Sequence, residues 1–118
     1  MSWTVPLPQD NWKERDTYVF LREVWTRIKA DTFTWDPPNL ASGVTTDTTL
    51  TSTDASQLAG LRAGMPIFVT PPSTLNSGLV VAGAWVPSDD QLTIRIYNSN
   101  GSATNPLSGT WGFGGFLP

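Results

Sequence analysis

Residues 60–109 read GLRAGMPIFVTPPSTLNSGLVVAGAWVPSDDQLTIRIYNSNGSATNPLSG, and this stretch decides the fold. It contains three apolar runs, at residues 65–70, 79–86 and 91–97, and each run ends in turn-forming residues such as Pro, Asn, Asp or Gly. Short strands at this spacing are typical of an antiparallel sandwich or barrel, and not of a parallel sheet with crossover helices.

The third run alternates between apolar and polar side chains, which is the period of a half-buried strand. The side chains predicted to face the core are those of Leu92, Ile94 and Ile96. The side chains predicted to point outward are those of Thr93, Arg95 and Tyr97.

Further strands are predicted on both sides of this stretch. Residues 32–36 alternate threonine with Phe33 and Trp35, and residues 44–53 are a threonine-rich segment that suits an edge strand. Residues 58–61 form a short strand or a turn. Residues 108–118 interleave aromatics with glycines and predict a last strand with a close approach or bulge at Gly114 and Gly115. The total is six or seven strands.

The composition limits the possible functions. The chain has 118 residues, no cysteine, no histidine and a net charge of −3. It fits one domain with an appended segment, and it lacks the basic surface that nucleic acids or anionic membranes attract. No apolar run approaches the roughly 20 residues that span a bilayer, and no export signal is recognisable, so we expect a soluble protein without nucleic-acid or membrane partners.

Residues 1–9 predict an extended arm, because prolines at positions 6 and 8 disfavour a helix. The large apolar side chains of this arm are spaced two apart, at Trp3, Val5 and Leu7. Exposed apolar groups of this size are unfavourable in water, so we expect the arm to dock on another surface.

Residues 10–31 predict an amphipathic helix, with Asp10 as its N-cap. One apolar stripe at 3-4-3 spacing consists of Tyr18, Leu21, Trp25 and Ile28. This stripe suits either a helix lying on its own sandwich or a short self-association seam. Trp12 and Phe20 widen the apolar surface, so we expect two contacts, one to the sandwich and one to a neighbouring chain.

The distribution of charge marks a boundary at the end of this helix. Ten of the 17 charged residues lie between residues 10 and 31, five of each sign, whereas only Arg62 and Arg95 are basic beyond that point. The predicted organisation is therefore an arm at 1–9, a helix at 10–31 for oligomerisation or attachment, and a β-sandwich module at 32–118, either immunoglobulin-like or jelly-roll-like.

Few residues are of the types that catalyse reactions or bind metal ions. Without His or Cys, acyl-transfer triads and most zinc sites are ruled out. Asp89 and Asp90 suit a solvated turn, with a calcium site as the alternative, and no pair of acids stands out for glycoside hydrolysis. The tryptophans of the β-module suit a core or a subunit interface, with a sugar-stacking platform as the alternative. We expect no catalytic residue, no cofactor and no metal.

The residues from 32 to 116 resemble a small β-module in virion proteins of tailed bacteriophages. The shared pattern begins with Gly60-Leu61, Gly64, Val69 and Pro72, and continues with Gly78-Leu79, Gly83-Ala84 and Val86. It ends with Leu92, Ile94-Arg95 and Asn98, followed by Pro106, Ser108-Gly109-Thr110 and Trp111.

The resemblance implies a homotrimeric part of a virion that contacts the major capsid protein or other virion proteins. The first expectation is a capsid cement or decoration protein, or a head fibre. The second is a tail-fibre or receptor-binding component, and the third is a free carbohydrate-binding domain. The residues expected at the oligomer or attachment interface are Trp3, Val5, Leu7, Trp12, Tyr18, Leu21, Trp25 and Ile28.

Overall fold

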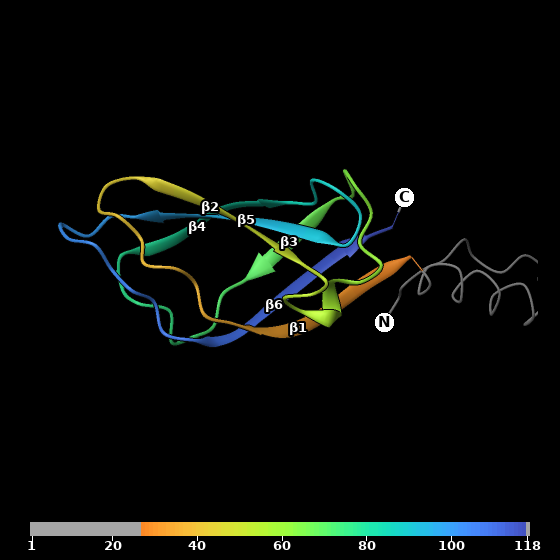
Figure 1. Cartoon of the computed structure of the whole chain (residues 1–118), viewed down its shortest axis with the longest axis horizontal. Helices are drawn as coiled ribbons and strands as arrows, with labels where there is room; N and C mark the ends of the chain where they lie inside the picture. The colour runs from red at the N-terminus through yellow and green to blue at the C-terminus, as the bar shows by residue number, and fades with distance from the viewer. Residues whose placement is uncertain (1–26, 118) are drawn as a thin grey trace, which may run out of the picture.

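The computed structural model describes residues 27–117, which form six strands and one short 3-10 turn (Figure 1). The strands are β1 (Ile28–Trp35), β2 (Thr45–Thr51), β3 (Ile67–Thr70), β4 (Leu79–Trp85), β5 (Gln91–Asn98) and β6 (Gly109–Phe116), and the turn is η1 (Ser56–Leu58). The prediction of a mainly β, antiparallel chain is confirmed.

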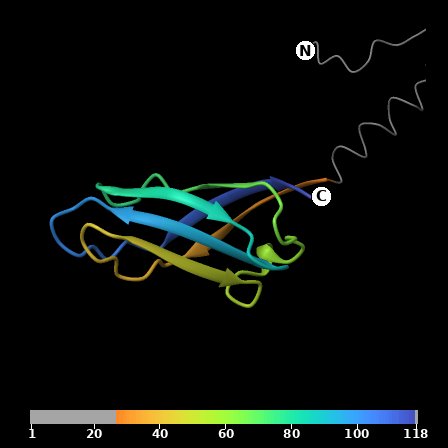
Figure 2. The same cartoon turned by 90° about the horizontal axis from the view of Figure 1, so that it is seen from above.

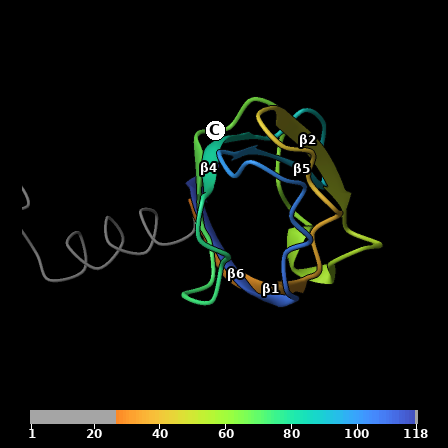
Figure 3. The ribbon, with the colours of Figure 1, turned by 90° about the vertical axis from the view of Figure 1, so that its left-hand side faces the viewer.

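The strands form two three-stranded antiparallel sheets, in the orders β1-β6-β3 and β2-β5-β4. Seen from one end, the two sheets lie as facing layers (Figure 3), and Figure 2 shows β5 between β2 and β4 in the layer nearer the viewer. Only β4 and β5 follow one another within a sheet; every other connection between strands crosses from one layer to the other. Because the two layers face each other, each sheet has one inner and one outer face.

The core lies between the inner faces and takes side chains from both sheets. Leu92, Ile94 and Ile96 of β5 are buried as predicted, opposite Phe33, Trp35, Trp111 and Phe113 of the other sheet. The rings of Trp35 and Trp111 meet edge to face, with centroids 4.9 Å apart. A chain this small therefore builds its core from aliphatic residues in one layer and aromatic residues in the other.

The buried side chain of Asn98 fixes the loop that joins β5 to β6. Its Nδ2 donates to the carbonyl oxygens of Leu40 (3.0 Å) and Ser102 (3.2 Å), and its Oδ1 accepts the backbone N–H of Asn100 at 2.9 Å. A buried amide is stable only when its donors and acceptors are paired, so this loop is held at the end of the layers opposite Arg27.

The predicted helix is corrected at its C-terminal end. Residues 10–26 lie outside the described residues, but Ile28 begins β1, and the strand pairs without interruption from Ile28↔Phe116 to Trp35↔Gly109. The strand predicted at 32–36 thus starts four residues earlier. Pairing with the whole length of β6 outweighs the helical spacing that appeared to continue to Ile28.

Three smaller expectations are refined by the strand register. Residues 44–53 contain the edge strand β2, as predicted, and residues 58–61, expected as a strand or a turn, begin at the last residue of η1 and continue as a turn. The close approach at Gly114 and Gly115 is confirmed, since a side chain on Gly115 would collide with the backbone oxygen of Pro66. The pairing of β6 with β1 is regular there, so no bulge is present.

Candidate interaction surfaces

Most of the predicted attachment residues lie outside the described residues. These are Trp3, Val5, Leu7, Trp12, Tyr18, Leu21 and Trp25. Ile28 is described: it is half-buried at the start of β1 and stands opposite Phe116 of β6. Arg27, next to it, accepts a hydrogen bond from the backbone N–H of Leu117 at 2.7 Å. Residues 1–26 therefore join the sandwich at the corner where β1 begins and β6 ends.

The outer face of sheet β1-β6-β3 begins at this corner, and we call it the Phe face. Alternation with the buried residues places ten side chains or glycines on it: Ile28, Ala30, Thr32 and Thr34 of β1, Thr110, Gly112, Gly114 and Phe116 of β6, and Phe68 and Thr70 of β3. Phe68 is 62% exposed and Phe116 is 55% exposed. None of these ten residues carries a charge.

The glycines of β6 give the Phe face its shape. Gly114 lies under the ring of Phe68, because a Cβ on this glycine would be 2.5 Å from Phe68 Cζ. With no side chain at Gly112 or Gly114, the face is low along the central strand, and the ring of Phe68 covers Gly114. The main exposed apolar patch of a soluble protein is often functional.

The outer face of sheet β2-β5-β4 is built differently. Arg95 of β5 donates two hydrogen bonds to Asp47 of β2, from Nε at 2.7 Å and from Nη2 at 3.0 Å. The guanidinium Cζ also lies 5.0 Å from the centre of the Trp85 ring of β4. A carboxylate, a guanidinium and an indole from three strands thus lie together, although the register partner of Arg95 on β4 is Gly83 and that of Trp85 is Thr93. The hydrogen bond and the charge of Arg95 lower the pKa of Asp47, and Asp47 raises the pKa of Arg95.

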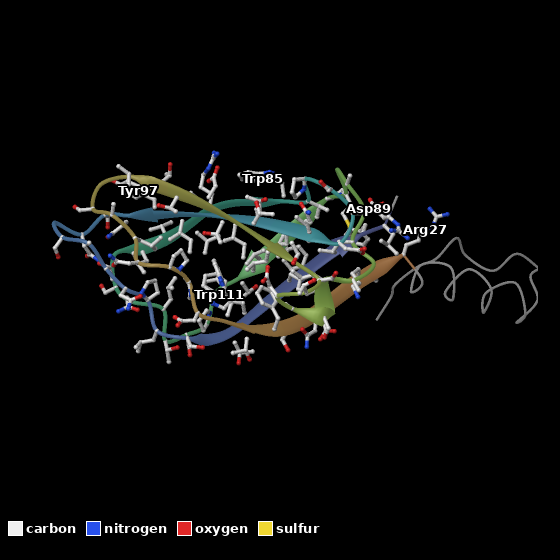
Figure 4. The ribbon with its side chains drawn as sticks, viewed as in Figure 1. Arg27, Trp85, Asp89, Tyr97 and Trp111 are labelled. Atoms are coloured by element: carbon white, nitrogen blue, oxygen red, sulfur yellow. The ribbon has the colours of Figure 1, made fainter. Side chains whose placement is uncertain are left out.

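One prediction on this face needs correction. Thr93 points outward, but it is only 4% exposed. It stands between Thr49, whose hydroxyl lies 2.8 Å from its own, and its cross-strand neighbour Trp85. Trp85 was expected in the core or at an interface, and only the core is excluded, because Figure 4 shows Trp85 and Tyr97 on the outer side of the sheet and Trp111 between the layers. An interface role for Trp85 stays a prediction. The indole of Trp85 is 37% exposed and passes over Gly83, which offers no side chain to displace it.

Asp89 and Asp90 have a structural role in the turn between β4 and β5. Asp90 Oδ1 accepts the backbone N–H of Gly60 at 2.7 Å, and Asp89 Oδ1 accepts that of Ala63 at 3.0 Å. Asp90 itself has a φ of 63°, a conformation that Asp adopts more readily than most residues. The turn was expected to be a solvated tip, and its two carboxylates also hold the loop at residues 60–63 in place.

Within residues 27–117, no group of three or more metal-ligating side chains gathers at one place. The same residues contain no helix with the length and apolar character needed to cross a membrane. Comparisons of the whole chain with protein-family models, curated proteins and solved structures found no match.

Phe68 and Phe116 were not among the predicted interface residues, although the sequence carries a signal for both. Phe116 follows Phe113 by three positions, an odd number that places it on the opposite face of the strand. Phe68 alternates in the same way with Ile67 and Val69, which pack against the core. Strand parity therefore points to both residues once the buried face is known.

Proposed function

We propose that this chain is a non-enzymatic structural protein of a tailed-bacteriophage virion, acting as a trimeric capsid cement or decoration protein or as a head fibre. The immunoglobulin-like or jelly-roll-like class of the sandwich belongs to the same proposal. The motif between Gly60 and Trp111 supports it by resemblance, and the two antiparallel sheets are compatible with such a module.

The observation that carries the proposal is the uncharged Phe face. Phe68 and Phe116 are more than half exposed beside the glycines of β6, and this arrangement suits a protein that works within an assembly. The face lies at the corner where the aromatic-rich residues 1–26 enter, so the described sandwich and the predicted attachment segment meet there. The carboxylates of Asp47, Asp89 and Asp90 are engaged in structural contacts, which favours a structural role over acid–base chemistry.

The proposal is tested with the purified full chain and the separated heads and tails of the phage that encodes it. We expect light scattering to give about three times the 12.8 kDa chain mass. We also expect the labelled chain to sediment with heads, and an excess of unlabelled chain to compete for this binding. Sedimentation with tails would support a tail-fibre or receptor-binding component instead. A monomer that sediments with neither would contradict the proposal.

A carbohydrate-binding domain is the second candidate, and the outer face of sheet β2-β5-β4 favours it. Trp85 and Tyr97 are both exposed there, and exposed aromatic rings can stack on sugars while neighbouring threonines and Asp47 offer hydrogen bonds. This candidate predicts a monomer that binds on a glycan array and loses binding in a Trp85→Ala variant. A Val80→Ala variant on the same face is the matched control.

A further inference from the structure

The Phe face is an outer surface that the described sandwich leaves uncovered. Its apolar side chains gather around the corner of Ile28 and Phe116, while its polar residues are threonines near the other end of β1 and β6. The two charged residues of this sheet, Lys29 and Asp31 of β1, alternate with the outward residues, so no charged residue of the sheet lies on this face. A surface of this kind favours an apolar partner over water or a polar ligand.

The size of the face limits what can cover it. Three strands about 4.8 Å apart, each with up to four outward residues about 6.6 Å apart, give roughly 350 Å². Each partner in a stable complex buries about 800 Å². Two copies joined only through their Phe faces would therefore reach less than half of that area. The occupant must bring additional apolar surface of its own.

Residues 1–26 supply such a surface and enter at the right place. They contain five large aromatic residues, namely Trp3, Trp12, Tyr18, Phe20 and Trp25. The first described strand begins two residues after this segment, at Ile28, on the rim of the Phe face. Aromatic side chains supply most of the energy of protein interfaces, so this segment has the chemistry that the face requires.

The sequence at the junction favours a neighbouring copy over the same chain. To lie on its own Phe face, the segment would have to reverse its direction just before Ile28. Sharp reversals use Gly, Pro, Asn or Asp, and residues 17–30, TYVFLREVWTRIKA, contain none of these. A sharp reversal is therefore disfavoured at this junction, and cover from a neighbouring copy is favoured.

We infer that residues 1–26 of one copy cover the Phe face of a second copy. A segment of one chain then meets a sheet face of another: two copies that exchange segments form a closed dimer, and copies joined head to tail form a ring when the rotation closes. Closure after three copies gives the homotrimer; for this number the inference rests on the proposed function. Phe68 and Phe116 are then the anchors on the sandwich, and the aromatics of the segment are the anchors of the neighbour.

The first experiment removes the anchors from the full chain. In a Phe68→Ser, Phe116→Ser variant we expect the mass in solution to fall from that of the oligomer to 12.8 kDa. The melting curve of the sandwich should still be cooperative, because both side chains are more than half exposed. The matched control is Val80→Ser with Tyr97→Ser, two exposed residues on the outer face of the other sheet, and it should stay oligomeric. An unchanged mass in the Phe variant would overturn the inference.

The second experiment asks which chain supplies the segment. The sequence has no cysteine, so single cysteines can be introduced without background. A Leu21→Cys chain is mixed with a mass-tagged Thr70→Cys chain and treated with a flexible bis-maleimide. We expect a cross-linked pair of the two different chains. Thr45→Cys, an exposed outward position on β2, replaces Thr70→Cys in the control and should give little of this product.

A chain that carries both Leu21→Cys and Thr70→Cys completes the design. If dilution leaves this chain cross-linked only to itself, the segment covers its own sheet and the inference is wrong. A wild-type chain that is monomeric at all concentrations would overturn it as well. A Phe-dependent oligomer that binds neither heads nor tails would leave this inference standing and remove the proposed function. A Phe68→Ser, Phe116→Ser variant that remains oligomeric and still binds heads would overturn this inference and leave the proposed function standing.

Discussion

The two outer faces of the sandwich differ although both belong to three-stranded antiparallel sheets. Sheet β2-β5-β4 carries the Asp47–Arg95 ion pair with the Trp85 indole beside it, and it buries Thr93 beneath these neighbours. The outer face of sheet β1-β6-β3 presents two exposed phenylalanines and two glycines and no charged residue. The first face has its own polar and aromatic cover, whereas the described residues leave the second uncovered.

The central strands explain this difference. β5 alternates aliphatic residues inward with Arg95 and Tyr97 outward, so it supplies side chains to both faces. β6 places Trp111 and Phe113 inward and has glycines at positions 112 and 114 outward. A glycine-lined central strand makes a flat surface on which another chain can lie closely. Both sheets therefore contribute to the core, but only the central strand β5 also carries large side chains along its outer face, whereas β6 has glycines there.

The largest effect on folding is expected from the inner face of β5. Ile94 is fully buried in the core cluster, so Ile94→Ala should lower the free energy of unfolding by about 2–5 kcal/mol. Ile67→Ala on β3 should cost less, because Ile67 is only partly buried at the margin of the same cluster. Urea denaturation of both variants measures the difference. Equal losses would mean that the two sheets contribute equally to the core.

Two adjacent glycines on β6 provide the next test. A methyl group on Gly115 would collide with the backbone oxygen of Pro66, so Gly115→Ala should cost about 1–3 kcal/mol of stability. A methyl group on Gly114 would meet the ring of Phe68, which is exposed and can move aside. Gly114→Ala should therefore fold almost normally but weaken assembly, since it reshapes the Phe face. The same loss of melting temperature in both variants would contradict the proposed flat docking surface.

A smaller effect separates the aromatic residues of the two outer faces. Trp85→Ala removes the ring beside Arg95 and uncovers Thr93, so we expect a loss of about 1–2 kcal/mol in the folded monomer. Phe68→Ala should cost less than about 1 kcal/mol, because its ring is mostly exposed in a single chain. Chemical denaturation at low protein concentration, where assembly is minimal, measures both values. A greater loss for Phe68→Ala would mean that the Phe face is already covered within one chain.

Much of the β-architecture was predictable from local patterns. Turn residues separate the runs between Gly60 and Gly109, and the alternation in residues 91–97 gave the buried face of β5 correctly. The burial of Thr93 could not be predicted in this way, because it depends on Thr49 and Trp85 from other strands. Local alternation indicates where a side chain points, but not which neighbour covers it.

The junction at Ile28 shows a second limit of the sequence. Its position fits a helical stripe with Leu21 and Trp25, yet its partner in the structure is Phe116, almost ninety residues further along the chain. Pairing between distant segments is decided by the whole sheet, so helical spacing near the junction was misleading. Phe116 was not among the residues predicted at an interface, because an aromatic residue among glycines shows its exposed side only through its parity relative to the buried Phe113.

The smallest effect concerns the ion pair that belongs only to the outer face of β2-β5-β4. The hydrogen bond from Arg95 lowers the pKa of Asp47 in the folded chain below its ordinary value of 3.8. Such a carboxylate stabilises the fold above the pKa of the unfolded state, and this contribution is lost as the pH falls through the lower folded pKa. Asp47→Asn should therefore melt slightly below wild type at pH 7, and the difference should shrink below about pH 4 and disappear once the pH is below the lowered folded pKa.

Both partners are exposed, so the difference at pH 7 should be small and should decrease further in high salt. The control is the same substitution in an Arg95→Gln background. Without the guanidinium, Asp47→Asn should leave the melting temperature almost unchanged between pH 7 and pH 2. If the difference between wild type and Asp47→Asn instead stays constant down to pH 2, the ion pair contributes nothing to the fold. The outer face of β2-β5-β4 would then depend on Trp85 and the threonines for its cover, and its contrast with the Phe face would be one of shape and not of charge.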